Sequence, residues 1–366
     1  MEQQSTFPLE LDELERLYNQ LDGEAPKVSM DCSRDHLTLL ELLESEPASN
    51  NFVERLKKHH DLLKLLQSTT YGEYTVFVPV DAGWTESDKM QCHENMLAMH
   101  ISPHYLSTTA LKDWPNLPTL LRTGASNRKP VLQSSFGSSG WWINRCNRIV
   151  KSNMMARNGI AHLIQRPCPP PPQVDSVVQG RQDLCFVSEA IRQLSHEELI
   201  STTQAQTLFV PSDEAFGELG SDVVNFLSKT EQGRPYMLAL LKLHILPQVT
   251  VFCNFIWPKN DTEERWTSSH VPRKIKGKVC YTFASLASDK QGGAFCVTVA
   301  FYRFRGLVSM LVNQSARVTS QDHCAMNGAV HVIDRVLLPL GDECATNPGS
   351  RHLTVHQLKK VLAEYI

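Results

Sequence analysis

The sequence predicts a mixed α/β (α+β) fold in which one unit of helices and strands occurs twice. Three landmarks predict it, because each is present in both halves of the 366 residues and in the same order. They are a β-rich block of the form Thr-x-Phe-Val-Pro-x-Asp, an apolar segment ending in His-Ile-x-Pro, and an Asn-Gly turn before an apolar run. At roughly 150 residues per domain, the chain has room for two such units.

The β-rich block covers residues 75–81 in the first half and 207–213 in the second. Its β-branched and aromatic residues favour a strand, the proline ends that strand, and the aspartate suits the N-cap of a following helix. Upstream of each block, apolar residues recur with helical spacing, which predicts a preceding helix. They are Phe52, Val53, Leu56, Leu63 and Leu66 in the first half, and Phe186, Val187, Ala190, Ile191 and Leu194 in the second.

The other two landmarks each contain a histidine within an apolar run. The helical segments end in His100 and His244, and the strands after the Asn-Gly turns contain His162 and His331. Because an unpaired imidazole is costly in apolar surroundings, one interpretation is a structural histidine held by a hydrogen bond to the backbone. The other interpretation is a general acid/base, because imidazole titrates near neutral pH.

The landmarks lie further apart in the second half, so we expect longer loops there, chiefly at 217–235 and 254–294. The proline-rich stretch between the halves suits a semi-rigid spacer. The predicted organisation is an acidic amphipathic helix in 1–30, a domain at 31–166, a linker at 167–174, a domain at 175–340, and a tail at 341–366 with a short helix at 355–362.

Composition and motifs exclude several classes of function. The 36 Lys and Arg against 39 Asp and Glu give a formal charge of −3, which argues against a nucleic-acid partner. No apolar run reaches the roughly 18 residues of a membrane-spanning helix. The sequence has no Gly-x-Gly-x-x-Gly, no phosphate-binding loop and no Cys-x-x-Cys pair, so we predict neither a cofactor nor a metal.

The sequence is compatible with two hypotheses about the cellular compartment of the protein. The N-terminus has neither a basic segment nor an apolar stretch of signal-peptide length, so we expect a cytoplasmic protein with ten reduced cysteines. The alternative is a truncated form of a secreted, cell-surface or vacuolar protein. In that case we expect glycans on Asn260 and Asn313, and a disulfide between Cys280 and Cys296, which flank a Gly-Gly turn.

These landmarks resemble the fasciclin-like domain family. The second copy matches the family pattern closely at Thr207–Phe216, His244 and Asn327–Pro339, whereas the first has Gly83-Trp84 in place of Ala-Phe. The resemblance implies two compact domains in tandem, each a twisted sheet wedge with a helical layer. It also implies that the domains are adhesion or matrix modules, mostly without catalysis, in an extracellular, cell-wall or vacuolar location.

Two functions of different classes fit the sequence. The first is a non-catalytic binding or adhesion protein whose partner is a protein or a small apolar ligand. The second is a cofactor-free isomerase or cyclase that acts on a small apolar metabolite in a biosynthetic pathway. The family's adhesive tyrosine is absent, because Met99 and Leu243 precede the helical histidines. The candidate acid/base residues of the second function are His244, His331, His100 and His162.

We also expect the two copies to differ in whether they fold independently. Residues 175–340 keep every landmark and are expected to fold independently. The first copy is expected to depend on its neighbour, because it has lost the apolar closing strand after Ile164.

Overall fold

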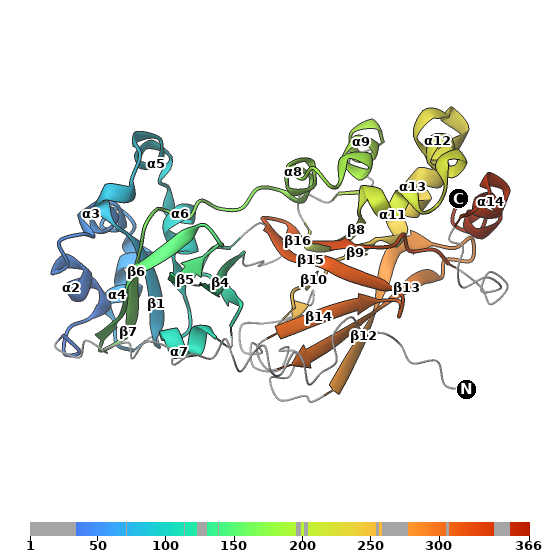
Figure 1. Ribbon diagram of the computed structural model, residues 1–366. Helices are drawn as coiled ribbons and strands as arrows, with labels where there is room; N and C mark the ends of the chain where they lie inside the picture. Colours follow the sequence, from blue (N-terminus) through green and yellow to red (C-terminus); the bar gives the residue numbers. More distant parts are fainter. Residues whose placement is uncertain are drawn as a thin grey trace.

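The computed structural model shows two domains, one in each half of the chain (Figure 1). It describes residues 34–70, 72–112, 114–122, 130–137, 139–194, 199–200, 204–253, 256–257, 277–304, 307–339 and 352–366. The amphipathic helix expected in residues 1–30 and the expected glycosylation site Asn260 lie outside the described residues.

The first domain places helices before and after its first strand, as the spacing of apolar residues predicts. Its seven-stranded sheet has the order β2-β1-β7-β6-β5-β4-β3. The helices are α2 (Leu39–Glu44), α3 (Asn50–Leu56), α4 (His60–Gln67), α5 (Glu86–Gln91), α6 (Glu94–Met99) and α7 (Thr108–Leu111). The strands are β1 (Tyr74–Pro79), β2 (Ile101–Ser102), β3 (Asn116–Pro118), β4 (Val131–Gly137), β5 (Gly140–Ile143), β6 (Asn147–Ala156) and β7 (Gly159–Ile164).

The second domain repeats this arrangement, with the sheet order β12-β13-β14-β15-β16-β8-β9. Its helices are α8 (Val174–Gln179), α9 (Cys185–Gln193), α11 (Asp213–Gly217), α12 (Ser221–Lys229), α13 (Arg234–Leu243) and α14 (Val355–Leu362). Its strands are β8 (Gln206–Pro211), β9 (Ile245–Pro247), β12 (Gly277–Ser288), β13 (Ala294–Phe304), β14 (Leu307–Val312), β15 (Ala316–Ala325) and β16 (Gly328–Ile333), beside a small pair, β10 (Thr250–Val251) and β11 (Ile256–Trp257).

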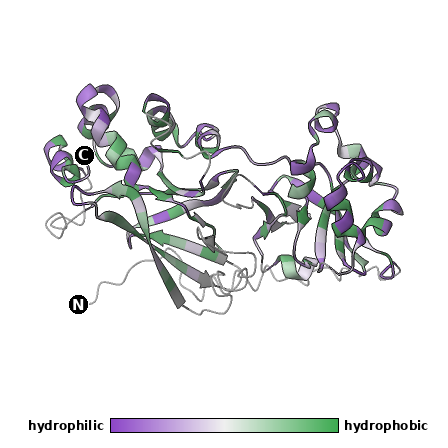
Figure 2. Ribbon diagram, turned by 180° about the vertical axis from the view of Figure 1, so that it is seen from behind, coloured by the Kyte–Doolittle hydropathy of each residue, from purple (hydrophilic) through white to green (hydrophobic). Residues whose placement is uncertain are grey.

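The repeated β-rich block and the strand after the Asn-Gly turn are hydrogen-bonded neighbours. β1 pairs in parallel with β7, and β8 pairs in parallel with β16. All four strands are buried along their whole length, which explains why they read as continuous apolar runs. Figure 2 shows hydrophobic residues along these central strands, with polar residues on the outer parts of the helices. Each domain therefore has its own core.

The two aspartates of the repeated block cap helices other than the expected ones. The Asp81 carboxylate accepts hydrogen bonds from Asn50 and Asn51, at the start of α3. In the second domain the Asp213 carboxylate accepts from Cys185 and Phe186, at the start of α9. Each aspartate thus fixes the preceding helix onto the end of the central strand, because its carboxylate accepts hydrogen bonds from the free backbone N–H groups at the N-terminus of that helix.

Two further expectations need correction. Residues 217–235 are not simply a longer loop, since they contain α12. The described part of 254–294 contains β11, β12 and the start of β13, while residues 254–255 and 258–276 lie outside the described residues. The first copy has not lost its closing strand, because β7 and β16 both have six residues and the same parallel register. The expected weakness of the first domain therefore loses its premise.

The expected disulfide between Cys280 and Cys296 is also wrong. Both residues lie on the β12–β13 hairpin, but Cys280 pairs with Ala300, and Cys296 pairs with Ala284. The two thiols are therefore offset by four residues, about 13 Å along the strands, which is too far for an S–S bond. Both cysteines are free and exposed.

The linker and the tail are both anchored to the domains. Residues 167–173 form neither helix nor strand, as their prolines predict. Cys168 contacts the first domain through its backbone N–H, and the Pro172 carbonyl accepts a hydrogen bond from Met326 of the second. The short helix expected at 355–362 is α14, and its Leu358 and Leu362 are fully buried in the second core.

Candidate functional site

Each domain has one histidine at the end of a helix. This histidine links the helix to the segment that follows the last central strand of the same domain. In the first domain, the His100 Nδ1–H donates to the Met96 carbonyl at 2.6 Å. Its Nε2 accepts the Cys168 N–H at 2.9 Å. The second domain repeats both bonds, at 2.8 Å each, with His244, Leu240 and Leu337.

The two strand histidines join the central strand to a loop and to a neighbouring strand. In the second domain, the His331 Nε2–H donates to the Val251 carbonyl at 2.8 Å, and its Nδ1 accepts the Asp322 N–H at 3.1 Å. The ring stacks on Phe209 with centroids 5.3 Å apart. The first domain has the same arrangement, formed by His162, Leu106, Asn153 and Phe77.

A threonine from the repeated block completes each strand-histidine network. The Thr207 hydroxyl donates to the Val249 carbonyl and accepts the Val251 N–H, both at 2.9 Å. It therefore holds the loop whose carbonyl the strand histidine binds. The equivalent bonds of the first domain involve Thr75, His104 and Leu106. This is the physical reason why the block begins with threonine in both copies.

Burial governs the protonation of all four histidines. It lowers the pKa of His100, His162 and His244 from 6.5 to about 4, against a smaller opposite effect of the hydrogen bonds to backbone carbonyls. Burial also lowers the pKa of His331, although the Asp322 carboxylate acts in the opposite direction. At neutral pH the four rings are neutral, with both nitrogens of each engaged by backbone groups.

The structure does not bring the four candidate residues into one site. His100 and His162 belong to the first core and His244 and His331 to the second, and each is at most 3% exposed. The cavity beside His244 measures about 10 Å³ and has an otherwise apolar lining, so it has room for about one water molecule. Asn313, the other expected glycosylation residue, lies in the β14–β15 turn, where its side chain accepts the Thr298 N–H.

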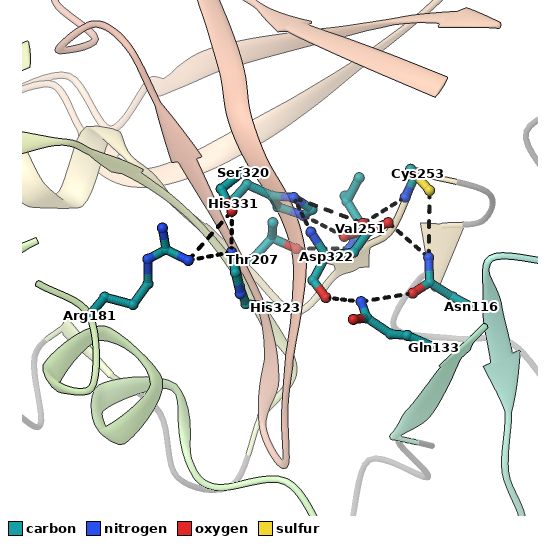
Figure 3. Close-up of polar contacts among 10 residues, drawn as sticks. All are labelled: Asn116, Gln133, Arg181, Thr207, Val251, Cys253, Ser320, Asp322, His323 and His331. Atoms are coloured by element: carbon teal, nitrogen blue, oxygen red, sulfur yellow. Dashed lines mark hydrogen bonds and ion pairs between the residues drawn. The ribbon is translucent and has the colours of Figure 1, made fainter. Parts of the chain in front are cut away.

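A polar cluster that the sequence analysis missed joins β15 to the segment between α8 and α9, beside the His331 network (Figure 3). Arg181 forms a bidentate ion pair with Asp183, and its Nη1 donates to the His323 Nε2 at 2.8 Å. Ser320 Oγ lies 2.8 Å from the same nitrogen. Burial, and then the Arg181 charge, lower the pKa of His323 to about 4.

The arginine limits what this cluster can do. A guanidinium only donates, so the His323 Nε2 bears a lone pair and the hydroxyl of Ser320 donates to it as well. A serine–histidine pair of this kind is the arrangement of an activated nucleophile. Here, however, Arg181 shares the lone pair that would take the proton. No local motif marks the cluster in the sequence, because Arg181 is 139 residues from Ser320.

Also on β15, Asp322 reaches the first domain. Its Oδ2 accepts the Asn116 Nδ2–H at 2.9 Å, and the Gln133 side chain donates to its backbone carbonyl. Its Oδ1 accepts the Cys253 N–H at 2.9 Å. Figure 3 shows Asn116 and Gln133 extending toward β15 from the strands of the first domain. The Asp322 carboxylate beside His331 therefore makes a buried hydrogen bond between the two domains.

Truncation of a histidine in these networks is expected to destabilise the fold. His244→Ala and His331→Ala each leave a cavity and orphan two buried backbone groups, so each should lower the free energy of unfolding by roughly 3 kcal/mol. Urea unfolding of the full chain measures this, and His60→Ala, at an exposed helical position, is the control. An unchanged unfolding midpoint in either variant would contradict the structural role.

Comparison with known families identifies the repeated unit. The model of the fasciclin domain matches residues 47–169 and 186–339, which together are more than half of the chain. The chain belongs to the fasciclin domain family. The two matched regions fall on the two domains of the structure, so the protein contains a tandem pair of fasciclin domains, with mixed α/β architecture in each.

Two curated proteins and one solved structure illustrate the range of its relatives. The fasciclin pair is 25% identical over 324 residues to the aurofusarin biosynthesis cluster protein S of Gibberella zeae, a match that covers 83% of this chain and 78% of that protein. It is 23% identical over 279 residues to human periostin, covering 73% of this chain and 28% of periostin. A FAS1 domain pair from the insect cell adhesion molecule fasciclin I is 17% identical, with a TM-score of 0.37, covering 80% of this chain and 97% of that one.

Within the described ranges, no helix has the length and apolar character needed to cross a membrane. Among the same residues, no group of three or more His, Cys, Asp or Glu side chains is placed to hold a metal ion.

Proposed function

We propose that this protein is a non-catalytic binding protein, in which two fasciclin domains act as adhesion-type modules toward a protein partner. The observation that carries the proposal is the engagement of the four histidines. Each is buried, neutral at pH 7 and bound through both ring nitrogens to backbone groups. A substrate would have to displace a backbone partner to reach any of them.

Two further observations support a binding role. The resemblance of the sequence to fasciclin-like domains implied adhesion and matrix modules, mostly without catalysis, and the family is now established. The cavity beside His244 is smaller than any metabolite with several carbon atoms. We therefore infer that the histidines shared by both domains stabilise the fold, and that a partner binds to the outer surface.

A second candidate function is a cofactor-free isomerase or cyclase that acts on a small apolar metabolite. Its support is the name of one relative, aurofusarin biosynthesis cluster protein S, whose similarity extends over both domains. In this candidate function one of the core histidines would act as the acid/base, which requires an opening of the core beside it.

One experiment separates the two functions. The purified full chain is added to an extract of host cells from which its gene has been deleted, and the small molecules are followed by mass spectrometry. Immobilised chain is used in parallel to isolate host proteins, and the affinity of each purified candidate is measured by calorimetry. We expect saturable binding of a host protein and no consumption of a metabolite.

A catalytic role would give the opposite result. A host metabolite would disappear and a product would form in proportion to the added chain. The variant His244→Gln tests whether that turnover uses the core histidine, because glutamine retains one donor and one acceptor. Turnover that this variant loses without a change in melting temperature would overturn the binding proposal.

A further inference from the structure

The strand-histidine networks of the two fasciclin domains have different side chains at the position nine residues before the histidine. The first domain has Asn153 there, and the second has Asp322. Both have left-handed backbone geometry, with φ of 56° and 63°, and both donate their backbone N–H to the histidine. The backbone role is therefore the same, and the difference lies in the side chain.

In the first domain the side chain binds only within its own domain. The Asn153 Oδ1 accepts the Thr108 N–H at 2.9 Å, and its Nδ2 donates to the Thr108 hydroxyl at 2.8 Å. The equivalent of Thr108 in the second domain is Cys253, which offers the N–H but has a thiol in place of the hydroxyl. Asp322 thus keeps the bond to the backbone N–H. Its second oxygen lacks a hydroxyl beside it like the one that the Asn153 amide binds in the first domain.

That second oxygen binds the other domain. The Asp322 Oδ2 accepts the Asn116 Nδ2–H at 2.9 Å, and the same amide lies 3.5 Å from the Cys253 Sγ. Gln133 holds Asn116 in place by donating to its Oδ1 at 3.3 Å, and it also donates to the Asp322 carbonyl. A carboxylate acceptor makes the bond to Asn116 charge-assisted and stronger than a bond between two amides.

The surroundings of this contact exclude water. Asp322 is 4% exposed and Asn116 is 1% exposed. Val131 of the first domain packs in one apolar cluster with Phe252 and Ala329 of the second. Met326, in the turn after β15, packs against the core of the first domain. Loss of the Asn116 amide would therefore leave a buried carboxylate with an unsatisfied oxygen.

We propose that Asp322 and Asn116 form an interdomain clamp that holds the two fasciclin domains in one fixed relative orientation. The clamp consists of the Asp322 carboxylate, the Asn116 amide and the Gln133 amide that orients it. The two domains then unfold as one cooperative unit, and the fixed pair presents one composite surface. The coupling of the two domains by this clamp does not depend on which function the pair performs.

An exchange of the two side chains tests the clamp. Asn116→Asp sets two carboxylates against each other and should separate the domains. The double variant Asn116→Asp with Asp322→Asn restores one carboxylate and one amide with the direction of the hydrogen bond reversed. The control is Asn95→Asp, which introduces the same charge at an exposed position of α6. All four proteins are full-length chains.

The readouts are the radius of gyration from small-angle scattering and the number of transitions in calorimetry. We expect Asn116→Asp to increase the radius of gyration and to split one transition into two, the lower shifted by on the order of 10 °C. The exchanged variant and the control should match the wild type. Should Asn116→Asp prevent folding altogether, a folded exchanged variant with the wild-type radius still supports the clamp.

Two results would overturn the proposal. One is an Asn116→Asp protein with the wild-type radius of gyration and a single transition at the wild-type temperature. The other is an exchanged variant that behaves like Asn116→Asp or does not fold, because the pairing of these two side chains would then not be what holds the domains.

Discussion

Acidification from pH 7 to pH 5 is expected to unfold this protein, because its buried histidines take up protons only when the core opens. Burial lowers the pKa of His100, His162 and His244 to about 4 in the folded state, against 6.5 in an exposed ring. Below pH 6.5 the unfolded chain therefore binds more protons than the folded chain. Stability then falls as the pH falls, and the loss continues until the pH reaches about 4.

The magnitude follows from the same values. Each of these three histidines should cost about 2 kcal/mol of stability at pH 5. The reason is that pH 5 lies 1.5 units below 6.5, and each unit corresponds to about 1.36 kcal/mol per histidine. The three together approach the whole stability of an ordinary domain. His331 should add to the loss, because its pKa is lowered as well.

Urea unfolding at a series of pH values between 7 and 5 measures this effect. His60→Ala is the matched control, because it removes an imidazole ring at an exposed position of α4 and leaves the four buried histidines in place. A free energy of unfolding that stays constant from pH 7 to pH 5 would contradict the burial of neutral histidines.

Replacement of Gly328 by alanine is expected to be the most damaging single substitution of the second domain. Gly328 begins β16 with φ of 155°, and a Cβ atom there would overlap the carbonyl group of Gln206 on the parallel neighbour β8. The carbonyl atoms of Gln206 belong to the backbone, so the overlap is relieved only if the two central strands separate. Strain and lost pairing together should cost roughly 4 kcal/mol.

The matched control is Gly217→Ala, because a Cβ at Gly217 has no atom within 4 Å and the site lies in a helix. Calorimetry of the full chain should show a large decrease in melting temperature for Gly328→Ala and a small change for the control. Equal melting temperatures in the two variants would show that β8 and β16 are not packed as closely as described. Gly159, at the start of β7, has the same constraint against Tyr74.

The Asn-Gly landmarks therefore have a tertiary cause that local turn chemistry did not reveal. The sequence analysis assigned Asn-Gly to a turn, and residues 157–158 do form one. The asparagine also binds across its domain, since the Asn158 side chain accepts the Leu39 N–H and donates to the Leu66 carbonyl. The glycine is required by the close approach of a strand more than eighty residues away in sequence.

The sequence by itself determined the tandem repeat, the family resemblance, the α/β class and the order of the main elements. It could do so because apolar spacing, strand-forming residues and prolines act over a few neighbouring residues, and two ordered copies reinforce one another. For the same reason the helices near residues 52–66 and 186–194, and the short helix at 355–362, were predictable.

Only the tertiary structure decided which side chains meet. It placed Cys280 and Cys296 four residues out of register, made Asp81 and Asp213 caps of preceding helices, and joined Asp322 to Asn116 across 206 residues. Local patterns carry no information about such contacts, because strand register and domain packing depend on the burial of whole faces. Asn153 and Asp322 show the reason most directly: they share one backbone role, and only the neighbouring domain gives the carboxylate its partner.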